Sequence, residues 1–140
     1  MIAKTVAGGI VCALVLAGCA SGPVVEAQRC DASGGCNVDV TVTSCHASAN
    51  VDPIEVFGRN RNIHWEIVNS PGYTFADPGI VVGTDSTHEF VDGQIAQQGK
   101  KYILLDKNTF ARNDPYPYEI KVLHDGSPCV TVDPGIINHG

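Results

Sequence analysis

Residues 37–44 read NVDVTVTS, and their pattern sets the fold class that we expect. Valine occupies every second position from Val38 to Val42, and aspartate or threonine fills the positions between and after them. Successive side chains of a β-strand point to opposite faces, so this alternation predicts a strand with one face in a core and the other in solvent. Valine and threonine are also among the residues that strands favour.

The same period of two returns in three later segments, NIHWEIV (62–68), YEIKVL (118–123) and CVTVD (129–133). The side chains expected to point inward from these segments are Ile63, Trp65, Ile67, Tyr118, Ile120, Val122, Val130 and Val132. Shorter strand candidates lie at 54–57, 80–82 and 101–105, and residues 94–98 are a candidate helical turn.

Clusters rich in proline, glycine, aspartate and asparagine separate these segments and are typical of turns. They are VDP (51–53), NSPGY (69–73), ADPG (76–79), VDG (91–93), NDPYP (113–117) and HDGSP (124–128). About seven short strands joined by such turns predict an all-β fold, an antiparallel Greek-key β-sandwich of the immunoglobulin-like kind.

The N-terminus has the layout of a secretory signal. A single cation, Lys4, precedes an uncharged and mostly apolar run over residues 6–17. A run of about a dozen residues is too short to cross the hydrocarbon core of a bilayer as a helix, which takes about 20. Residues 1–18 are therefore expected to be a removable signal peptide rather than a permanent anchor.

The end of this run, Leu16-Ala17-Gly18-Cys19, resembles the lipobox of bacterial lipoproteins at all four positions. The resemblance implies that the chain is cut before Cys19 and that this cysteine carries palmitate and other acyl chains, which anchor the protein to a membrane. The alternative is an ordinary signal peptide that contains a cysteine. Ala20 follows instead of the aspartate that marks inner-membrane retention in enterobacteria, which favours the outer membrane, facing the periplasm.

The expected organisation of the chain follows from these two patterns. Residues 1–18 form the signal peptide, residues 19–36 form a lipidated cysteine with a flexible tether, and residues 37–140 form the sandwich. Loss of Lys4 with the signal changes the formal net charge from −6 to −7. An acidic chain without a basic cluster in its sequence argues against a nucleic-acid partner. The expected partners are the membrane, through Cys19, and another protein of the cell envelope.

Four cysteines remain after the signal and the lipidated residue are set aside: Cys30, Cys36, Cys45 and Cys129. In an oxidising compartment they are expected to form disulfides. A strand over 37–44 would hold Cys36 and Cys45 about 30 Å apart, which excludes that pair. Of the two remaining schemes we prefer Cys30–Cys36 with Cys45–Cys129, and Cys30–Cys45 with Cys36–Cys129 stays open.

The body of the chain resembles a family of small exported proteins of Gram-negative bacteria with a cupredoxin-like β-sandwich. The segments that carry the resemblance are VTVTSC (40–45), VDPIEV (51–56), IHWEIVNSPGYTFADPGIVV (63–82), YEIKV (118–122) and DPGIIN (133–138). The resemblance implies a cupredoxin-like fold, and most members of the family have no characterised activity.

A cupredoxin-like fold raises the question of copper. A blue-copper centre takes two histidines, a cysteine and a weak axial methionine. Only His139 follows the late Cys129, and Met1 leaves with the signal, so no ligand position carries over. We expect no metal or other cofactor. The alternative is a metal or redox protein that uses His46 and His124 beside the Cys45–Cys129 bridge.

The sequence contains no G-x-S-x-G nucleophile elbow, EF-hand loop or zinc-binding His-x-x-x-His motif. We therefore expect no enzyme. The expected function is that of a non-catalytic β-sandwich, anchored to the membrane in the periplasm and serving as a binding or structural module of the cell envelope.

Overall fold

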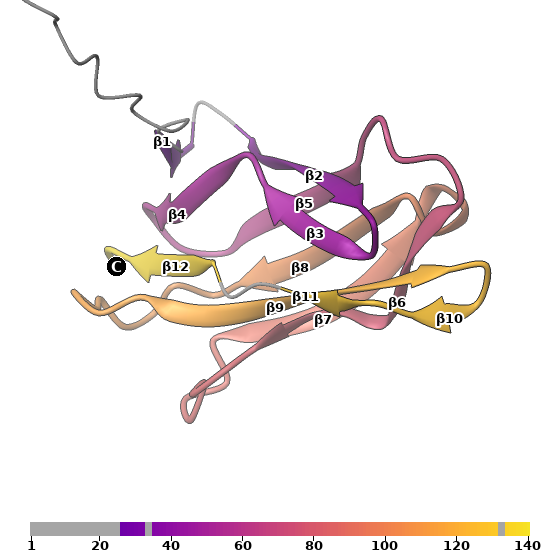
Figure 1. Ribbon diagram of the computed structural model, residues 1–140. Coiled ribbons are helices and arrows are strands. Elements are labelled where there is room, and N and C mark those ends of the chain that lie inside the picture. The colour runs from indigo at the N-terminus through magenta and orange to yellow at the C-terminus, as the bar shows by residue number, and fades with distance from the viewer. Residues whose placement is uncertain (1–25, 33–34, 132–133) are drawn as a thin grey trace, which may run out of the picture.

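The computed structural model describes residues 26–32, 35–131 and 134–140, which form an all-β sandwich of two six-stranded sheets (Figure 1). The first sheet contains, in spatial order, β1 (Glu26–Cys30), β4 (Val51–Val56), β12 (Gly135–Asn138), β9 (Tyr116–His124) and β10 (Ser127–Pro128), and β6 (Tyr73–Val82) also pairs with β9. The second contains β11 (Val130–Thr131), β3 (His46–Ala49), β2 (Cys36–Thr43), β5 (Arg61–Ile67), β8 (Lys101–Asp106) and β7 (Phe90–Ala96).

The predicted sandwich is confirmed, but both sheets are mixed rather than antiparallel. Strand β4 is parallel to both β1 and β12, β2 is parallel to β5, and β11 is parallel to β3. The described residues also form twelve strands instead of about seven. Alternation of apolar and polar residues reads the same in either chain direction, so it indicates a half-buried strand without showing how that strand pairs.

The inward faces of the three strongest strand predictions are confirmed. Strand β2 alternates buried and exposed residues along its whole length, and the predicted side chains of β5 and β9 are buried. Val130 lies on β11, but its side chain and the whole of Val132 are outside the described part of the chain. The predicted faces meet in one apolar core between the sheets.

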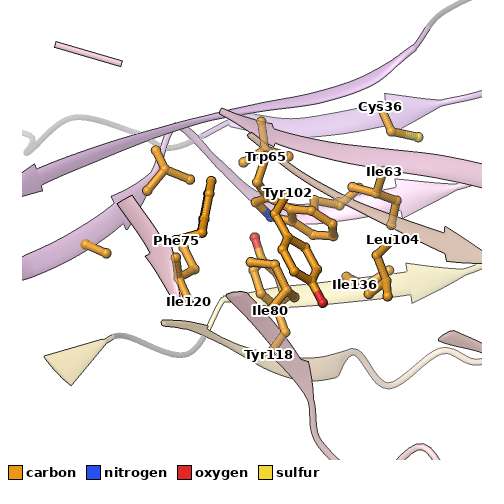
Figure 2. Packing of buried hydrophobic residues seen from close by; sticks show 14 of the residues in the cluster. Cys36, Ile63, Trp65, Phe75, Ile80, Tyr102, Leu104, Tyr118, Ile120 and Ile136 are labelled. Atoms are coloured by element: carbon orange, nitrogen blue, oxygen red, sulfur yellow. The ribbon is translucent and has the colours of Figure 1, made fainter. Parts of the chain in front are cut away.

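Trp65 lies at the centre of this core with no solvent exposure. Its ring meets the ring of Tyr118 edge to face, with centroids 5.5 Å apart, so the contact joins β5 of one sheet to β9 of the other (Figure 2). Figure 2 shows the Tyr118 hydroxyl directed toward the indole nitrogen of Trp65. Burial raises the pKa of Tyr118 far above its ordinary value, although the Trp65 contact lowers it, and the phenol is therefore neutral.

Three of the predicted turns are wrong, because VDP, ADPG and VDG lie inside β4, β6 and β7. The strand pairing shifts register between Val51 and Ile54 in β4, between Phe75 and Ile80 in β6, and between Val91 and Gln94 in β7. Proline and glycine inside a sheet are characteristic of bulges. The same residue types thus mark bulges at these positions and turns elsewhere.

The aromatic ring of Tyr102 explains the glycines of the β6 and β7 bulges. A Cβ atom added to Gly79 would lie 2.7 Å from Cδ2 of Tyr102, and one added to Gly93 would overlap the Tyr102 hydroxyl. Tyr102 is buried on β8, between these two backbones. Only a residue without a side chain leaves room for the ring at either position.

The expected tether also needs correction, because Glu26–Cys30 within 19–36 forms strand β1. The sequence EAQRC carries no alternation of apolar residues and so gave no strand signal. The folded part of the chain begins before residue 37. The signal peptide and Cys19 lie outside the described residues.

The candidate helical turn at 94–98 is also misplaced. Residues 94–96 belong to β7, and the turn that follows is a single 3₁₀ turn at Gln97–Gly99, labelled η1. Within the described residues, no helix has the length and apolar character that crossing a membrane requires.

Candidate functional site

One end of the sandwich collects the loops that follow or precede several central strands. Strand β8 ends at Asp106, which is opposite the first residues of β5 and β7, Arg61 and Phe90. Strand β12 ends at Asn138, opposite Val56 at the end of β4. We call this end, formed by residues 57–60, 83–89, 107–115 and 139–140, the loop end; it lies beside the C-terminus in Figure 1.

A group of buried polar side chains holds the loops of the loop end in place through hydrogen bonds. Asp106, Asn108 and Asn138 are fully buried, and Glu89 is 1% exposed. Oδ1 of Asp106 accepts hydrogen bonds from the backbone N–H of Asn108, at 2.8 Å, and from Nδ2 of Asn138, at 3.1 Å. The second bond links β8 of one sheet to β12 of the other. We call these four residues the polar cluster.

Asn108 fixes two chain segments at once. Its Nδ2 donates to the carbonyl oxygens of Val56, at 3.2 Å, and Gly58, at 3.0 Å, and its Oδ1 accepts from the N–H of Gly140, at 3.1 Å. These bonds hold the 57–60 loop and the C-terminus against the end of β8. Glu89 similarly holds the start of the 107–115 loop, since its carboxylate accepts from the N–H and the hydroxyl of Thr109.

Asp106 is electrostatically unusual. Burial is the main cause that raises the pKa of its carboxyl to about 6, and the negative charges of Glu89 and Asp85 act in the same direction. The hydrogen bonds from Asn108 and Asn138 oppose this rise. Its second oxygen, Oδ2, is buried and accepts no hydrogen bond from any described residue, and the same is true of Oδ1 of Asn138.

Arginine and histidine side chains contact Phe57 at the loop end. The guanidinium of Arg29 lies 3.9 Å from the centroid of the Phe57 ring, and the imidazole of His139 stacks on that ring at 4.1 Å. Nε of Arg61 donates to the Phe57 carbonyl oxygen at 3.1 Å. Arg59 is exposed two residues along the same loop. Nε of Arg29 also lies 3.6 Å from the carboxylate of Asp31.

A second part of the surface lies over the 107–115 loop. The guanidinium of Arg112 stacks over the ring of Tyr116 at 4.2 Å, and Phe110 is 55% exposed. All four arginines of the chain, Arg29, Arg59, Arg61 and Arg112, therefore lie at or beside the loop end, in a protein whose formal net charge is −6. Arginine forks bind carboxylate and phosphate groups, and stacked arginines and exposed aromatics are enriched at interfaces.

A shallow pocket of about 400 Å³ adjoins Arg61, Asn60, Asn62 and His64, next to Cys36. Partial burial lowers the pKa of His64, and the charge of Lys101 lowers it further, so this imidazole is neutral at pH 7. The amides and the neutral imidazole can exchange hydrogen bonds with a polar group. Asp31 also lines this pocket, which therefore offers a guanidinium, amides, an imidazole and a carboxylate.

The four predicted disulfide cysteines are paired as we preferred. Cys30 bonds to Cys36, and Cys45 bonds to Cys129 across a sequence separation of 84 residues. The short bridge lies at the loop end, where β1 ends and β2 begins. The long bridge lies at the opposite end, where Cys45 occupies a turn with φ 62° rather than a strand position. Both bridges thus tie chain segments at the ends of the sandwich.

The alternative metal site at His46 and His124 gains no support from their surroundings. His124 stacks on Tyr73 at 4.5 Å and faces Asp125 at 3.7 Å, and His46 opens β3 at the surface. No hydrogen bond or ring contact joins the two imidazoles in the described structure. Across those same residues, no three His, Cys, Asp or Glu side chains are grouped so that they could hold a metal ion.

The polar cluster and the gathered arginines were not predicted from the sequence. Asp106 did carry a signal, because in KYILLD it falls at the inward parity of Tyr102 and Leu104. A carboxylate at such a position requires a buried partner. The arginines carried no signal, since they come together only through the topology of the strands. No protein-family model matches the chain, and no curated protein matches it.

Proposed function

We propose that this protein is a lipid-anchored module of the cell envelope that faces the periplasm and binds an anionic surface of another envelope protein through its loop end. The observation that carries the proposal is that all four arginines of an acidic chain lie at or beside the loop end. Two of these guanidinium groups stack on aromatic rings, which lowers the conformational freedom that binding would remove.

The direction of β1 supports this arrangement. Glu26 pairs with Val51 and Cys30 pairs with Val56, so β1 runs toward the loop end alongside β4. The N–H of Phe57 donates to the carbonyl oxygen of Cys30 at 2.8 Å. A lipid on Cys19 would therefore join the domain at the start of β1, which leaves the loop end at the other end of that strand. Such a placement directs the arginines away from the anchor.

The chemistry of the loop end favours a protein carboxylate surface as the partner. Arginine binds carboxylates through two parallel hydrogen bonds, and an aromatic residue such as Phe110 supplies apolar contact beside them. The polar cluster beneath holds the loops in place, so little ordering remains to be done when a partner binds.

Anchoring is tested by labelling a bacterial host with radioactive palmitate and fractionating its membranes. The wild-type protein is expected to carry the label and to sediment with outer membranes. Several acyl chains on one residue give firm attachment, so Cys19→Ala should leave the protein unlabelled and free in the periplasm. Cys12→Ala is the matched control and should behave as the wild type. A Cys19→Ala protein that stays with the membranes would refute the lipid anchor.

Binding through the loop end is tested by photo-crosslinking in whole cells. A photoreactive residue replaces Phe110 at the loop end or Ser127 at the opposite end, and both positions are exposed. The expected result is a defined adduct with one envelope protein from position 110 and none from position 127. Equal adducts from both positions, or an adduct from position 127 alone, would refute recognition by the loop end.

A further inference from the structure

Asp106 and Asn138 leave two buried oxygen atoms without a hydrogen-bond partner among residues 26–32, 35–131 and 134–140. These atoms are Oδ2 of Asp106 and Oδ1 of Asn138, and both residues are fully buried. The other terminal atoms of the same two side chains bond each other, because Nδ2 of Asn138 donates to Oδ1 of Asp106 at 3.1 Å. A carboxyl and a primary amide are planar groups of similar size. When one bond joins them, their remaining atoms can come together to close a second.

With an ionised carboxylate, that second position holds two acceptors and no donor. Rotating the amide of Asn138 by 180° would not solve this. It would bring the amide oxygen to Oδ1 of Asp106, which already accepts a bond from the N–H of Asn108. A proton on Oδ2 of Asp106 does solve it, since the hydroxyl can donate to Oδ1 of Asn138 while the first bond stays in place.

We propose that Asp106 and Asn138 form a closed carboxylic acid–amide pair that holds one buried proton, and that loss of this proton loosens the loop end. The proposal does not depend on the function proposed above. It assigns a proton to a site where the structure has two orphaned acceptors, and it names the segments that respond. A buried acceptor left unsatisfied is costly, and a buried unpaired charge costs more.

The charged groups around Asp106 fit a neutral carboxyl. Glu89 and Asp85, which precede β7, are both acidic, and their charges oppose ionisation. Arg61 is opposite Asp106 on β5, but its Nε donates to the carbonyl oxygen of Phe57. From the remaining neighbouring elements come His139, stacked on Phe57 and 4.0 Å from Glu55 of β4, and Arg112, stacked on Tyr116 of β9.

The direction of the pH effect follows from the pKa of Asp106, which burial raises to about 6 from an ordinary value of 3.8. The native state then holds this proton more tightly than the unfolded chain does. Its contribution to stability is complete below about pH 4 and is lost as the pH rises through about 6. A pKa difference of about two units corresponds to about a 100-fold change in the folding equilibrium constant.

The segments that respond are those that the polar cluster holds. Asn108 bonds Asp106 through its N–H, and through its side chain it holds the 57–60 loop and Gly140. The carbonyl of Asn138 accepts from the N–H of Arg112 at 2.8 Å. Ionisation of Asp106 should therefore increase hydrogen exchange at Gly140 and Arg112, compared with a variant that cannot ionise at position 106.

The proton is tested directly by carbon-13 NMR of the side-chain carboxyl groups in the full-length protein. The signal of Asp106 is expected to titrate with a midpoint near pH 6 and to be absent in Asp106→Asn. A midpoint at or below about 4, the ordinary range for aspartate, would overturn the closed pair. Because this measurement needs only the wild-type fold, it remains decisive if a variant folds poorly.

The loosening is tested by denaturant unfolding of the same chain from pH 4 to pH 8. Asp106→Asn places an amide NH₂ where the acid proton would be, so it should keep the pair closed at every pH. Relative to this variant, the wild type should lose about 100-fold in its folding equilibrium constant across the range. His139→Gln removes the imidazole that stacks on Phe57 and serves as the control, which should match the wild type. Identical pH profiles for the wild type and Asp106→Asn would overturn the proposal.

Discussion

Trp65 and Tyr118 join the two sheets through a single edge-to-face contact, with ring centroids 5.5 Å apart and both side chains almost fully buried. Within the described residues neither the indole N–H nor the phenol hydroxyl has a hydrogen-bond partner, although the hydroxyl points toward the indole nitrogen (Figure 2). The two rings fill the centre of the core, and the contact between them is one of ring packing.

This contact predicts that the ring of Tyr118 matters more than its hydroxyl. Tyr118→Ala should lower the free energy of unfolding by about 3–5 kcal/mol, because it leaves a cavity between the sheets. Tyr118→Phe keeps the ring and removes only a buried hydroxyl without a hydrogen-bond partner, so it should cost less than about 1 kcal/mol. Urea unfolding followed by Trp65 fluorescence measures both. Equal losses for the two variants would contradict this division.

The glycines of the β6 and β7 bulges make a second prediction. Gly79→Ala and Gly93→Ala force a methyl group into the ring of Tyr102, and each should lower the free energy of unfolding by about 1–3 kcal/mol. Gly83→Ala is the matched control, since its Cβ would meet Pro117 at ordinary contact distances of 3.4 Å and 3.5 Å. Its effect on thermal unfolding should be neutral or slightly stabilising. A Gly93→Ala protein as stable as Gly83→Ala would contradict the packing argument.

The long disulfide predicts a third result. Cys45→Ala with Cys129→Ala frees a chain segment of 84 residues and should lower the free energy of unfolding by about 2–5 kcal/mol. Cys30→Ala with Cys36→Ala opens a separation of only 6 residues and should cost less, since a shorter loop constrains the unfolded chain less. Denaturant unfolding of both double variants gives the comparison, and peptide mapping without reduction checks the pairing. A larger loss for the short bridge would contradict it.

Much of the fold could be predicted because alternation is a local property of a strand. The inward faces of β2, β5 and β9 follow from sequence parity alone. Strand direction could not be predicted, since parity is the same for parallel and antiparallel pairs. ADPG and VDG were mistaken for turns because glycine and proline serve both turns and bulges, and the ring of Tyr102 that distinguishes them lies elsewhere in the sequence.

The candidate site could be predicted much less well. Asp106 stood out only as a polar residue at an inward position, and its partner Asn138 is 32 residues further along the chain. The arginines at positions 29, 59, 61 and 112 are scattered in sequence, and the ends of different strands bring them to the same end of the sandwich. A site whose residues are far apart in the sequence is therefore hard to predict from short sequence patterns.

The proposed function depends on the positive charge of the arginines, and the yield of a crosslinked adduct reports on that charge. A photoreactive residue at position 110 forms the adduct, and its yield is measured in cells that carry Arg29→Ser, Arg59→Ser or both. Lys121→Ser is the control, because Lys121 is an exposed cation on β9, outside the loop end. We predict that the adduct yield of the double variant falls about 10-fold or more, since each guanidinium that binds a carboxylate contributes about 1.5–3 kcal/mol. The adduct yield of Lys121→Ser should equal that of the wild type. An undiminished adduct in the double variant would contradict recognition by the arginines of the loop end.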